Sequence, residues 1–348
     1  MSLMERRRTM KTTSSLPYFI AGLLFFGCSD EGGELPGTSL TDLYIHCLAA
    51  DGANLFAGTR GGVFRSTNNG RDWTSASSGL PHPWISALVV SPNGAGGTNL
   101  FAATDYGVAI STNNGTSWTP VNSGPPSTSG GHLAVNPGVT GGPTLFATSG
   151  HGLFRSTNNG TNWGHVILSP TDSIIWALAV TPDVTRGEYL FAGTDSGPFR
   201  STDNGTSWTS VNTGLTNTAV YSFAFSPDGT GGRNFFAGTF VHGVFRSTDD
   251  GTSWTPANSG LERMTIWCLA VIPDGTGGTG VFAGTNNGVF RSTDNGTHWI
   301  PVGLTNMIVW CFAVVPNGTS GTNLFAGTID GHGVFLSSND GLTWVSVN

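Results

Sequence analysis

The eight-residue stretch Ser201-Thr202-Asp203-Asn204-Gly205-Thr206-Ser207-Trp208 recurs, with small changes, seven times along the chain. Successive copies lie 45 or 46 residues apart, because they end at Trp73, Trp118, Trp163, Trp208, Trp254, Trp299 and Trp344. A constant period in this range, with strand-like segments between the copies, is typical of repeat architectures. The sequence therefore predicts one repeated structural unit over residues 41–348.

We call this stretch the corner motif. Its third side chain can accept backbone N–H bonds, its fifth residue is a Gly that tolerates positive φ, and its Trp is expected to fold back over the turn. The third position requires an acceptor and not a charge, which favours a structural role over a metal ligand or catalytic acid. Its occupants are Asn68, Asn113, Asn158, Asp203, Asp249, Asp294 and Asn339.

Four short apolar segments fill each period, as the sixth copy shows. The expected strands there are 266–271, 281–285 and 289–292, with a fourth that begins at Trp299. Sheets that are apolar on both faces cannot bury themselves alone, whereas seven of them around an axis can. The sequence predicts an all-β fold, a single seven-bladed β-propeller with four-stranded blades. First and last blades exchange no strand in this scheme, so face-to-face packing closes the ring.

The pattern S-x-D/N-x-G-x-x-W resembles the Asp-box, or BNR repeat, over residues 40–348. Asp-boxes occur in sialidases, sortilin-type receptors, xyloglucan-degrading hydrolases and a photosystem assembly factor. The resemblance implies that the corner joins the third and fourth strands. It also implies that ligands bind on the opposite face, formed by the second-to-third-strand loops and the connections between blades, which we call the variable face.

The N-terminal region carries a different signal. Arg6, Arg7, Arg8 and Lys11 precede the apolar run 16–27, which is too short to span a bilayer and is typical of a secretory signal. The run ends at Cys28, and this arrangement resembles a bacterial lipoprotein signal, although Phe25 and Phe26 depart from the usual pattern. We expect a signal peptide over 1–27, lipidation at Cys28, a tether over 28–40 and the propeller over 41–348. The protein would be an outer-membrane or cell-surface lipoprotein; the alternative is a secreted or periplasmic protein.

Charge and cysteine content restrict the possible partners. Beyond residue 28 the chain has ten Arg, no Lys and twenty acidic residues, which disfavours nucleic acid and anionic membranes. Membrane contact is expected through the Cys28 lipid only. Cys47, Cys268 and Cys311 do not form a disulfide framework, and the His residues show no metal-ligand spacing. We expect a monomer without metal or cofactor.

Candidate ligand-binding residues come from the first strands and the variable face. Trp176, Tyr221, Trp267 and Trp310 occupy equivalent positions in blades four to seven, and His46 stands there in blade one. Such rings suit a sugar or peptide, but they also suit packing between blades. The further candidates on the variable loops are Asp105, Tyr106, Asp195, His242, Asp330 and His332.

We therefore predict a non-catalytic, extracytoplasmic binding or scaffolding domain for a protein or glycan. The alternative is a glycan-active hydrolase, sialidase-like or xyloglucanase-like, that uses loop carboxylates. Glycoside hydrolysis needs two acids that face the scissile bond, and no local motif selects such a pair. The carboxylates available for it are Asp42, Asp105, Asp172, Asp195, Glu262 and Asp330.

Overall fold

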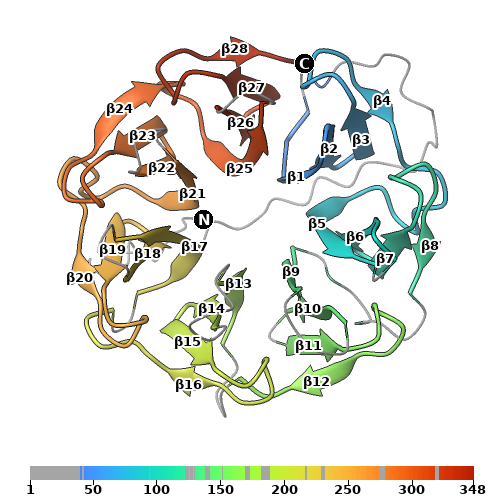
Figure 1. Cartoon of the computed structure of the whole chain (residues 1–348), viewed down its shortest axis with the longest axis horizontal. Coiled ribbons are helices and arrows are strands. Elements are labelled where there is room, and N and C mark those ends of the chain that lie inside the picture. Colours follow the sequence, from blue (N-terminus) through green and yellow to red (C-terminus); the bar gives the residue numbers. More distant parts are fainter. Residues whose placement is uncertain are drawn as a thin grey trace, which may run out of the picture. The chain divides into compact units, whose positions relative to one another are not determined.

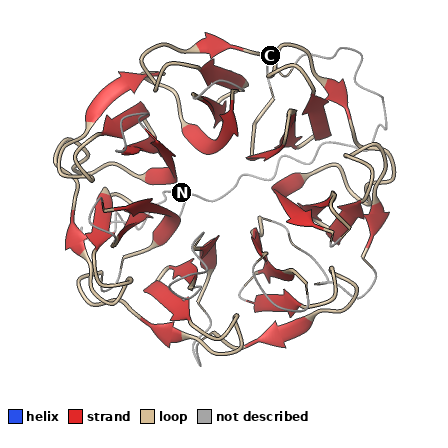
Figure 2. Cartoon of the chain, viewed as in Figure 1, coloured by secondary structure: helices blue, strands red, loops and turns tan. Residues whose placement is uncertain are grey.

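The computed structural model describes residues 40, 43–93, 95–121, 125, 128, 130–137, 142–150, 152–168, 173–181, 189–215, 218–228, 232–273, 279–317 and 321–348. Every regular element within them is a β-strand (Figure 2). None of these residues belongs to a helix long and apolar enough to cross a membrane. The expected signal peptide, Cys28, Asp42 and Asp172 lie outside the described residues.

The strands form seven antiparallel sheets of four consecutive strands, the blades. Blades 1 to 3 contain β1 (Cys47–Asp51), β2 (Asn54–Thr59), β3 (Gly62–Ser66), β4 (Thr74–Ser75), β5 (Ile85–Pro92), β6 (Thr98–Thr104), β7 (Gly107–Ser111), β8 (Thr119–Pro120), β9 (Leu133–Asn136), β10 (Thr144–Ser149), β11 (Gly152–Ser156) and β12 (Gly164–Val166). Blades 4 and 5 contain β13 (Ile175–Val180), β14 (Leu190–Thr194), β15 (Gly197–Ser201), β16 (Thr209–Ser210), β17 (Val220–Pro227), β18 (Arg233–Thr239), β19 (Val244–Ser247) and β20 (Thr255–Pro256). Blades 6 and 7 contain β21 (Ile266–Pro273), β22 (Thr279–Thr285), β23 (Gly288–Ser292), β24 (Ile300–Gly303), β25 (Val309–Pro316), β26 (Thr322–Thr328), β27 (Val334–Ser337) and β28 (Val345–Ser346).

The blades surround a common axis, and the fold is a seven-bladed β-propeller as predicted (Figure 1). The first strand of each blade lies nearest the axis and the fourth lies at the rim. Each sheet contains only strands that are consecutive in the chain, so blades 1 and 7 exchange no described strand. Ile45 N donates to Thr328 O at 2.8 Å, and Trp73 Nε1 donates to Val347 O at 2.6 Å. Backbone and side-chain bonds thus join the two blades at the seam.

The apolar core consists of layers between blades and not of one central cluster. Each of the seven clusters of buried side chains combines residues of two neighbouring blades. The layer at the seam joins Ile45 and Trp73 of blade 1 to Phe325 and Val347 of blade 7. Leu40, which precedes blade 1, is fully buried in this layer. Every blade is therefore stable only between its neighbours.

Two hydrogen bonds of the corner motif are the same in all seven copies. The Gly N–H donates to the first-position Ser Oγ at 2.8–3.0 Å. The third side chain accepts, through Oδ1, the backbone N–H of the seventh residue at 2.9 Å. Asn and Asp accept this bond equally, so an acceptor is sufficient at the third position.

Two successive residues of each corner are left-handed. The Gly has a φ near +80°, for example +75° at Gly205, and the Asn or Asp before it is also left-handed, with a φ of 56° at Asn204. Asn and Asp tolerate this region better than other side chains. A Cβ added at Gly205 would lie 2.3 Å from Phe146 of blade 3, and the other corner glycines similarly face the preceding blade. The Gly is required for this close approach as well as for φ.

The corner Trp differs from the expectation that it covers its own turn. Five of the seven indoles donate Nε1–H to a backbone carbonyl of the preceding blade, as Trp254 does to Val211 O at 2.9 Å. Trp163 and Trp208 instead bond the Gly carbonyl of their own corner. The indole reaches across because the neighbouring blade lies directly against the corner. Trp208 and Trp254 are 46 residues apart because the β18–β19 loop of blade 5 has one extra residue.

A Gly205→Ala substitution tests the contact between corner and preceding blade. The new Cβ would collide with Phe146 in a residue that is already left-handed, so we expect the free energy of unfolding to fall by about 3 kcal/mol. Gly52→Ala is the control, because Gly52 has a φ of +58° but nothing within 4 Å of an added Cβ. It should lose about 1 kcal/mol. Equal losses in urea unfolding would show that the contact contributes nothing.

Candidate functional site

The antiparallel order sorts the connections onto two faces. Loops between second and third strands share the variable face with the connections from one blade to the next. The corners, between third and fourth strands, lie on the opposite face together with the first-to-second-strand loops. The seven corners are alike, whereas the loops of the variable face differ in length and sequence.

A β-bulge places the four predicted rings. The register of the first strand shifts between Ile175 and Ala177, so that Trp176 is the extra residue, and the same shift occurs at Ser86, Tyr221, Trp267 and Trp310. The residue before each bulge is a buried Ile or Val of an inter-blade layer. A bulge re-aims the side chain it carries. It turns the ring out of the layer that its neighbour fills.

The four rings form one continuous array across blades 4 to 7. Trp176 meets Tyr221 edge-on at 5.2 Å between centroids, and Tyr221 stacks on Trp267 at 5.4 Å. Trp267 stacks on Trp310 at 4.6 Å. All four side chains are partly exposed, and burial raises the pKa of the Tyr221 hydroxyl. We call this set the aromatic array.

The array has unused hydrogen-bonding groups. The indole Nε1 atoms of Trp176 and Trp267 are buried and have no partner among the described residues. Each such donor destabilises the fold by about 1–3 kcal/mol unless a water or ligand satisfies it. Packing between blades explains the apolar parts of these rings, but it leaves their N–H groups unexplained.

The loop of blade 5 extends the array to the surface. The Phe240 ring lies 5.8 Å from that of Tyr221 and is 46% exposed. Val241 is left-handed at a φ of 54°, which is rare for a β-branched residue and is held by Val241 N–H donating to Thr265 Oγ1 at 3.3 Å. His242 Nδ1 lies 2.8 Å from Phe240 O. Strain of this kind is concentrated at functional sites.

A second cluster occupies blade 1 and its connection to blade 2. The guanidinium of Arg60 lies 5.0 Å from the ring centre of Tyr44 and 5.1 Å from that of Trp84. His46 lies 6.0 Å from Trp84, and its Nε2 is buried without a described partner. Burial, with a smaller contribution from Arg60, lowers the pKa of His46 to about 4. Trp84 was not among our candidate residues; its place in the connection from blade 1 to blade 2, which belongs to the variable face, was the available signal.

The other candidates are dispersed over the variable face. Asp105 Oδ2 lies 3.6 Å from His82 Nδ1, and Tyr106, 69% exposed, meets the His82 ring edge-on at 5.0 Å. Asp330 accepts the backbone N–H of Ile308 at 2.9 Å through Oδ2, while its buried Oδ1 has no described partner. Asp195 contacts the neighbouring Ser196, and His332 is exposed. No two of these three carboxylates form a described contact with each other.

The shifted carboxyl groups lie on the corner face. Hydrogen bonds, first from the Ser207 hydroxyl and then from backbone N–H groups, lower the pKa of Asp203 to about 2. Burial acts to raise the pKa values of Asp249 and Asp294, but hydrogen bonds outweigh it and lower both. These groups stay ionised and serve the turn.

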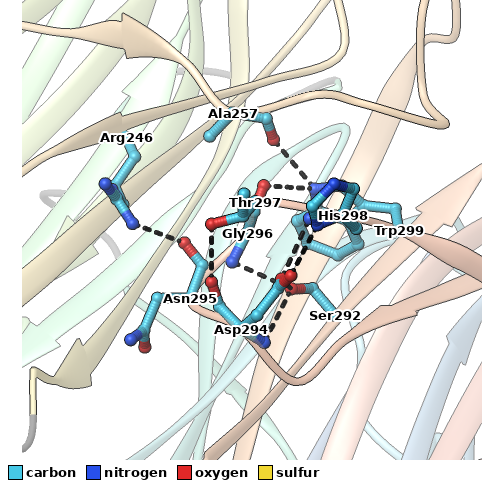
Figure 3. Close-up of polar contacts among 9 residues, drawn as sticks. All are labelled: Arg246, Ala257, Ser292, Asp294, Asn295, Gly296, Thr297, His298 and Trp299. Carbon is cyan, nitrogen blue, oxygen red and sulfur yellow. Dashed lines mark hydrogen bonds and ion pairs between the residues drawn. The ribbon is translucent and has the colours of Figure 1, made fainter.

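The Arg residues before the corners also have a structural role. Arg246 Nη1 donates to Asn295 O, in the corner of blade 6, at 3.0 Å (Figure 3). Arg155 and Arg200 make the corresponding bonds to Asn204 O and Asp250 O. These guanidinium groups therefore join neighbouring blades on the corner side and do not gather into an anion site.

Cys47, Cys268 and Cys311 are free thiols, and the described residues contain no cluster of three or more His, Cys, Asp or Glu that could hold a metal. Burial raises the pKa of Cys47 to about 12 and also raises those of Cys268 and Cys311. A buried thiol with a raised pKa is a poor nucleophile.

Comparisons with known proteins support the fold. No protein-family profile matches the chain, and no curated protein matches it in sequence. An ancestral GH74 enzyme is similar in structure, with a TM-score of 0.69 and 19% identity over 89% of this chain and 47% of that one. The extracellular domain of a one-component system from B. thetaiotaomicron has a TM-score of 0.65 and 18% identity over 85% of this chain and 38% of its own.

YCF48, solved with a bound D1 peptide, has a TM-score of 0.58 and 14% identity, and the match covers 86% of this chain and 95% of YCF48. The chain thus spans less than half of the enzyme and of the B. thetaiotaomicron domain. At identities this low, the structural similarity establishes a shared propeller fold and no shared function. The names of the three proteins describe an enzyme, an extracellular domain and a peptide-bound protein.

The environment of His46 predicts its titration. We expect NMR to give a pKa of about 4, and Arg60→Gln should raise it without reaching 6.5, because burial is the larger cause. Since unfolded His protonates near 6.5, stability should fall as the pH drops from 6.5 towards 4. His132, whose pKa burial also lowers to about 4, must be assigned separately. A His46 pKa near 6.5 in the unsubstituted protein would refute the described burial.

Proposed function

We propose that this chain is an extracytoplasmic, non-catalytic binding domain of the Asp-box type. It holds a protein or glycan on the variable face, and the aromatic array is the platform. The main support for this proposal is that the rings of Trp176, Tyr221, Trp267 and Trp310 contact one another in a continuous series. These rings are partly exposed, and two of their indole N–H groups have no described partner. Stacked rings offer flat apolar surface, and free N–H groups offer orientation, which is the usual composition of a binding site.

The polar residues around the array complete the proposed site. His46, Asp330 and the blade 5 loop with His242 supply hydrogen-bonding groups from blades 1, 5 and 7, and Asp105, Tyr106, Asp195 and His332 extend the same face. His46 Nε2 and Asp330 Oδ1 are buried without a described partner, as the two indoles are. A ligand or ordered water that meets these atoms would relieve their desolvation.

A non-catalytic role is favoured over glycan hydrolysis by the placement of the acids. Glycoside hydrolases bring two carboxyl groups to within about 5–10 Å across the scissile bond and raise the pKa of one. In this structure, the described carboxyl groups whose pKa values are shifted have lowered pKa values. They lie in the corners, on the face opposite the aromatic array. A hydrolase remains the alternative that the binding experiment must distinguish.

Export and lipid attachment at Cys28 belong to the same proposal and rest on the N-terminal sequence alone. A lipidated cysteine would anchor a domain whose net negative charge disfavours binding to anionic lipid. Mass spectrometry of the mature N-terminus decides between a lipidated Cys28 and a secreted chain.

An array of glycans and peptides, probed with the mature chain, tests the proposal. For any ligand found, Trp310→Ala and Trp176→Ala should weaken binding by about tenfold or more, or roughly 1.4 kcal/mol. Leu342→Thr is the control, since this side chain is 67% exposed in the blade 7 corner, on the face opposite the array, where most other blades carry Thr.

Unchanged binding in both Trp variants would remove the array from the site. Product formation from a bound glycan, abolished by Asp105→Asn, Asp195→Asn or Asp330→Asn, would replace the proposal with the hydrolase alternative.

A further inference from the structure

A second surface lies on the rim where blade 7 meets blade 1, away from the variable face. A hollow of about 390 Å³ opens there, lined by Arg71, Leu336, Thr343, Val345 and Val347, among others. Arg71 belongs to the corner of blade 1, and the other four lie on or beside β27 and β28 of blade 7. This surface is independent of the function proposed above.

The equivalent place between blades 5 and 6 shows what is unusual about the seam. Its hollow is smaller, about 270 Å³, and Arg246, Pro256, Ala257 and Thr297 line it at the positions of Leu336, Ser346, Val347 and Arg71. There the Arg246 guanidinium bonds the next corner (Figure 3). Leu336 has no such group, and with Val345 and Val347 it gives the hollow at the seam an apolar part beside its polar lining residues.

The rim strand at the seam also lacks the proline that the rim strands of three other blades have. β28 is the outermost strand of its sheet and pairs only with β27 among the described strands, so one edge is free. Blades 2, 5 and 6 carry Pro120, Pro256 or Pro301 in the equivalent strand. Val345 is 62% exposed, and its equivalents in blades 1, 2, 4 and 5 are Thr74, Thr119, Thr209 and Thr255. Proline and charged side chains on an edge oppose strand addition, and β28 has neither. β4 and β16 also lack both, but each carries a Thr where β28 has the exposed Val345.

The charge in the hollow indicates what kind of segment fits. Arg71 is exposed and forms no ion pair with any described residue. A guanidinium without an acidic partner is suited to a carboxylate from outside. β28 carries no acidic side chain, so the same strand of a second copy would not itself supply a partner for Arg71.

We propose that the β28 edge is a docking site for an extended segment of a partner protein. The segment adds a strand to β28, places an apolar side chain on Leu336 and Val345, and pairs a neighbouring Asp or Glu with Arg71. Backbone hydrogen bonds to a free edge provide affinity, and side-chain pockets beside it provide specificity. The free edge, the hollow and the unpaired cation each match one part of such a segment.

A random nonapeptide phage library, panned on the full-length protein, tests this inference. Enriched peptides should combine an apolar residue with a nearby Asp or Glu. They should bind two variants at least tenfold more weakly than the unsubstituted protein. One is the double variant Leu336→Arg/Val345→Thr, and the other is the single variant Arg71→Glu. The double variant installs residues that other blades already use at these positions, so its fold is expected to persist.

Two controls separate this site from others. Ile167→Thr removes an apolar side chain that is 74% exposed on the blade 3 rim, and Trp310→Ala alters the aromatic array; neither should change binding of these peptides. Loss of peptide binding in Trp310→Ala would assign the peptides to the variable face and overturn the inference.

The absence of enriched peptides, or equal binding to the double variant, would also overturn it. Analytical ultracentrifugation then measures the oligomeric state. If the unsubstituted protein is a dimer and the Val345→Thr variant is a monomer, a second copy occupies the edge instead of a partner protein, and the inference is wrong.

Discussion

The fifth-position glycine of each corner motif lies against the preceding blade, and the rest of the ring depends on this contact. Gly205 and Gly251 face Phe146 and Phe191, which are buried second-strand residues of the blades before them. Because the Gly and its left-handed neighbour set the direction of the turn, the corner Trp is carried to the same interface. One eight-residue sequence thus closes a turn and joins two sheets. Its repetition at the seam, where Gly70 faces Val347 and Phe325, closes the circle.

Because the corners join the blades, the side chains of the variable face are not needed for contacts between blades. The inter-blade layers take the residues before and after each bulge, while the bulged residue itself is turned away from them. Its identity can then vary from Ser86 to Trp267 without loss of the layer. The aromatic array arises because four consecutive blades carry a large ring at this place. Of the residues with unpartnered polar atoms, Trp176 and Trp267 lie on first strands, His46 directly precedes β1, and Asp330 lies in a second-to-third-strand loop.

The sequence was sufficient for the fold because the corner motif is local and periodic. Trp73 to Trp344 marked the blades, and in the sixth blade the strands lie within two residues of their expected ends. It was also sufficient to align the four rings, since they occupy one position of the repeat. It could not show that Trp254 bonds the blade before it, or that Arg60 lies between Tyr44 and Trp84. Those contacts join residues of different blades or loops, and their geometry follows from how the blades pack.

The most direct test is a double-mutant cycle of Gly205→Ala and Phe146→Leu, measured by urea unfolding. An added Cβ at Gly205 would lie 2.3 and 2.6 Å from the outer ring atoms of Phe146, which Leu lacks. If the corner packs on the preceding blade, Leu gives the new methyl group space, and the double variant is more stable than the sum of the single losses predicts by at least about 1 kcal/mol. Losses that add to within about 0.5 kcal/mol would show that the two residues do not interact, and the corner would then be a turn and not the joint between blades.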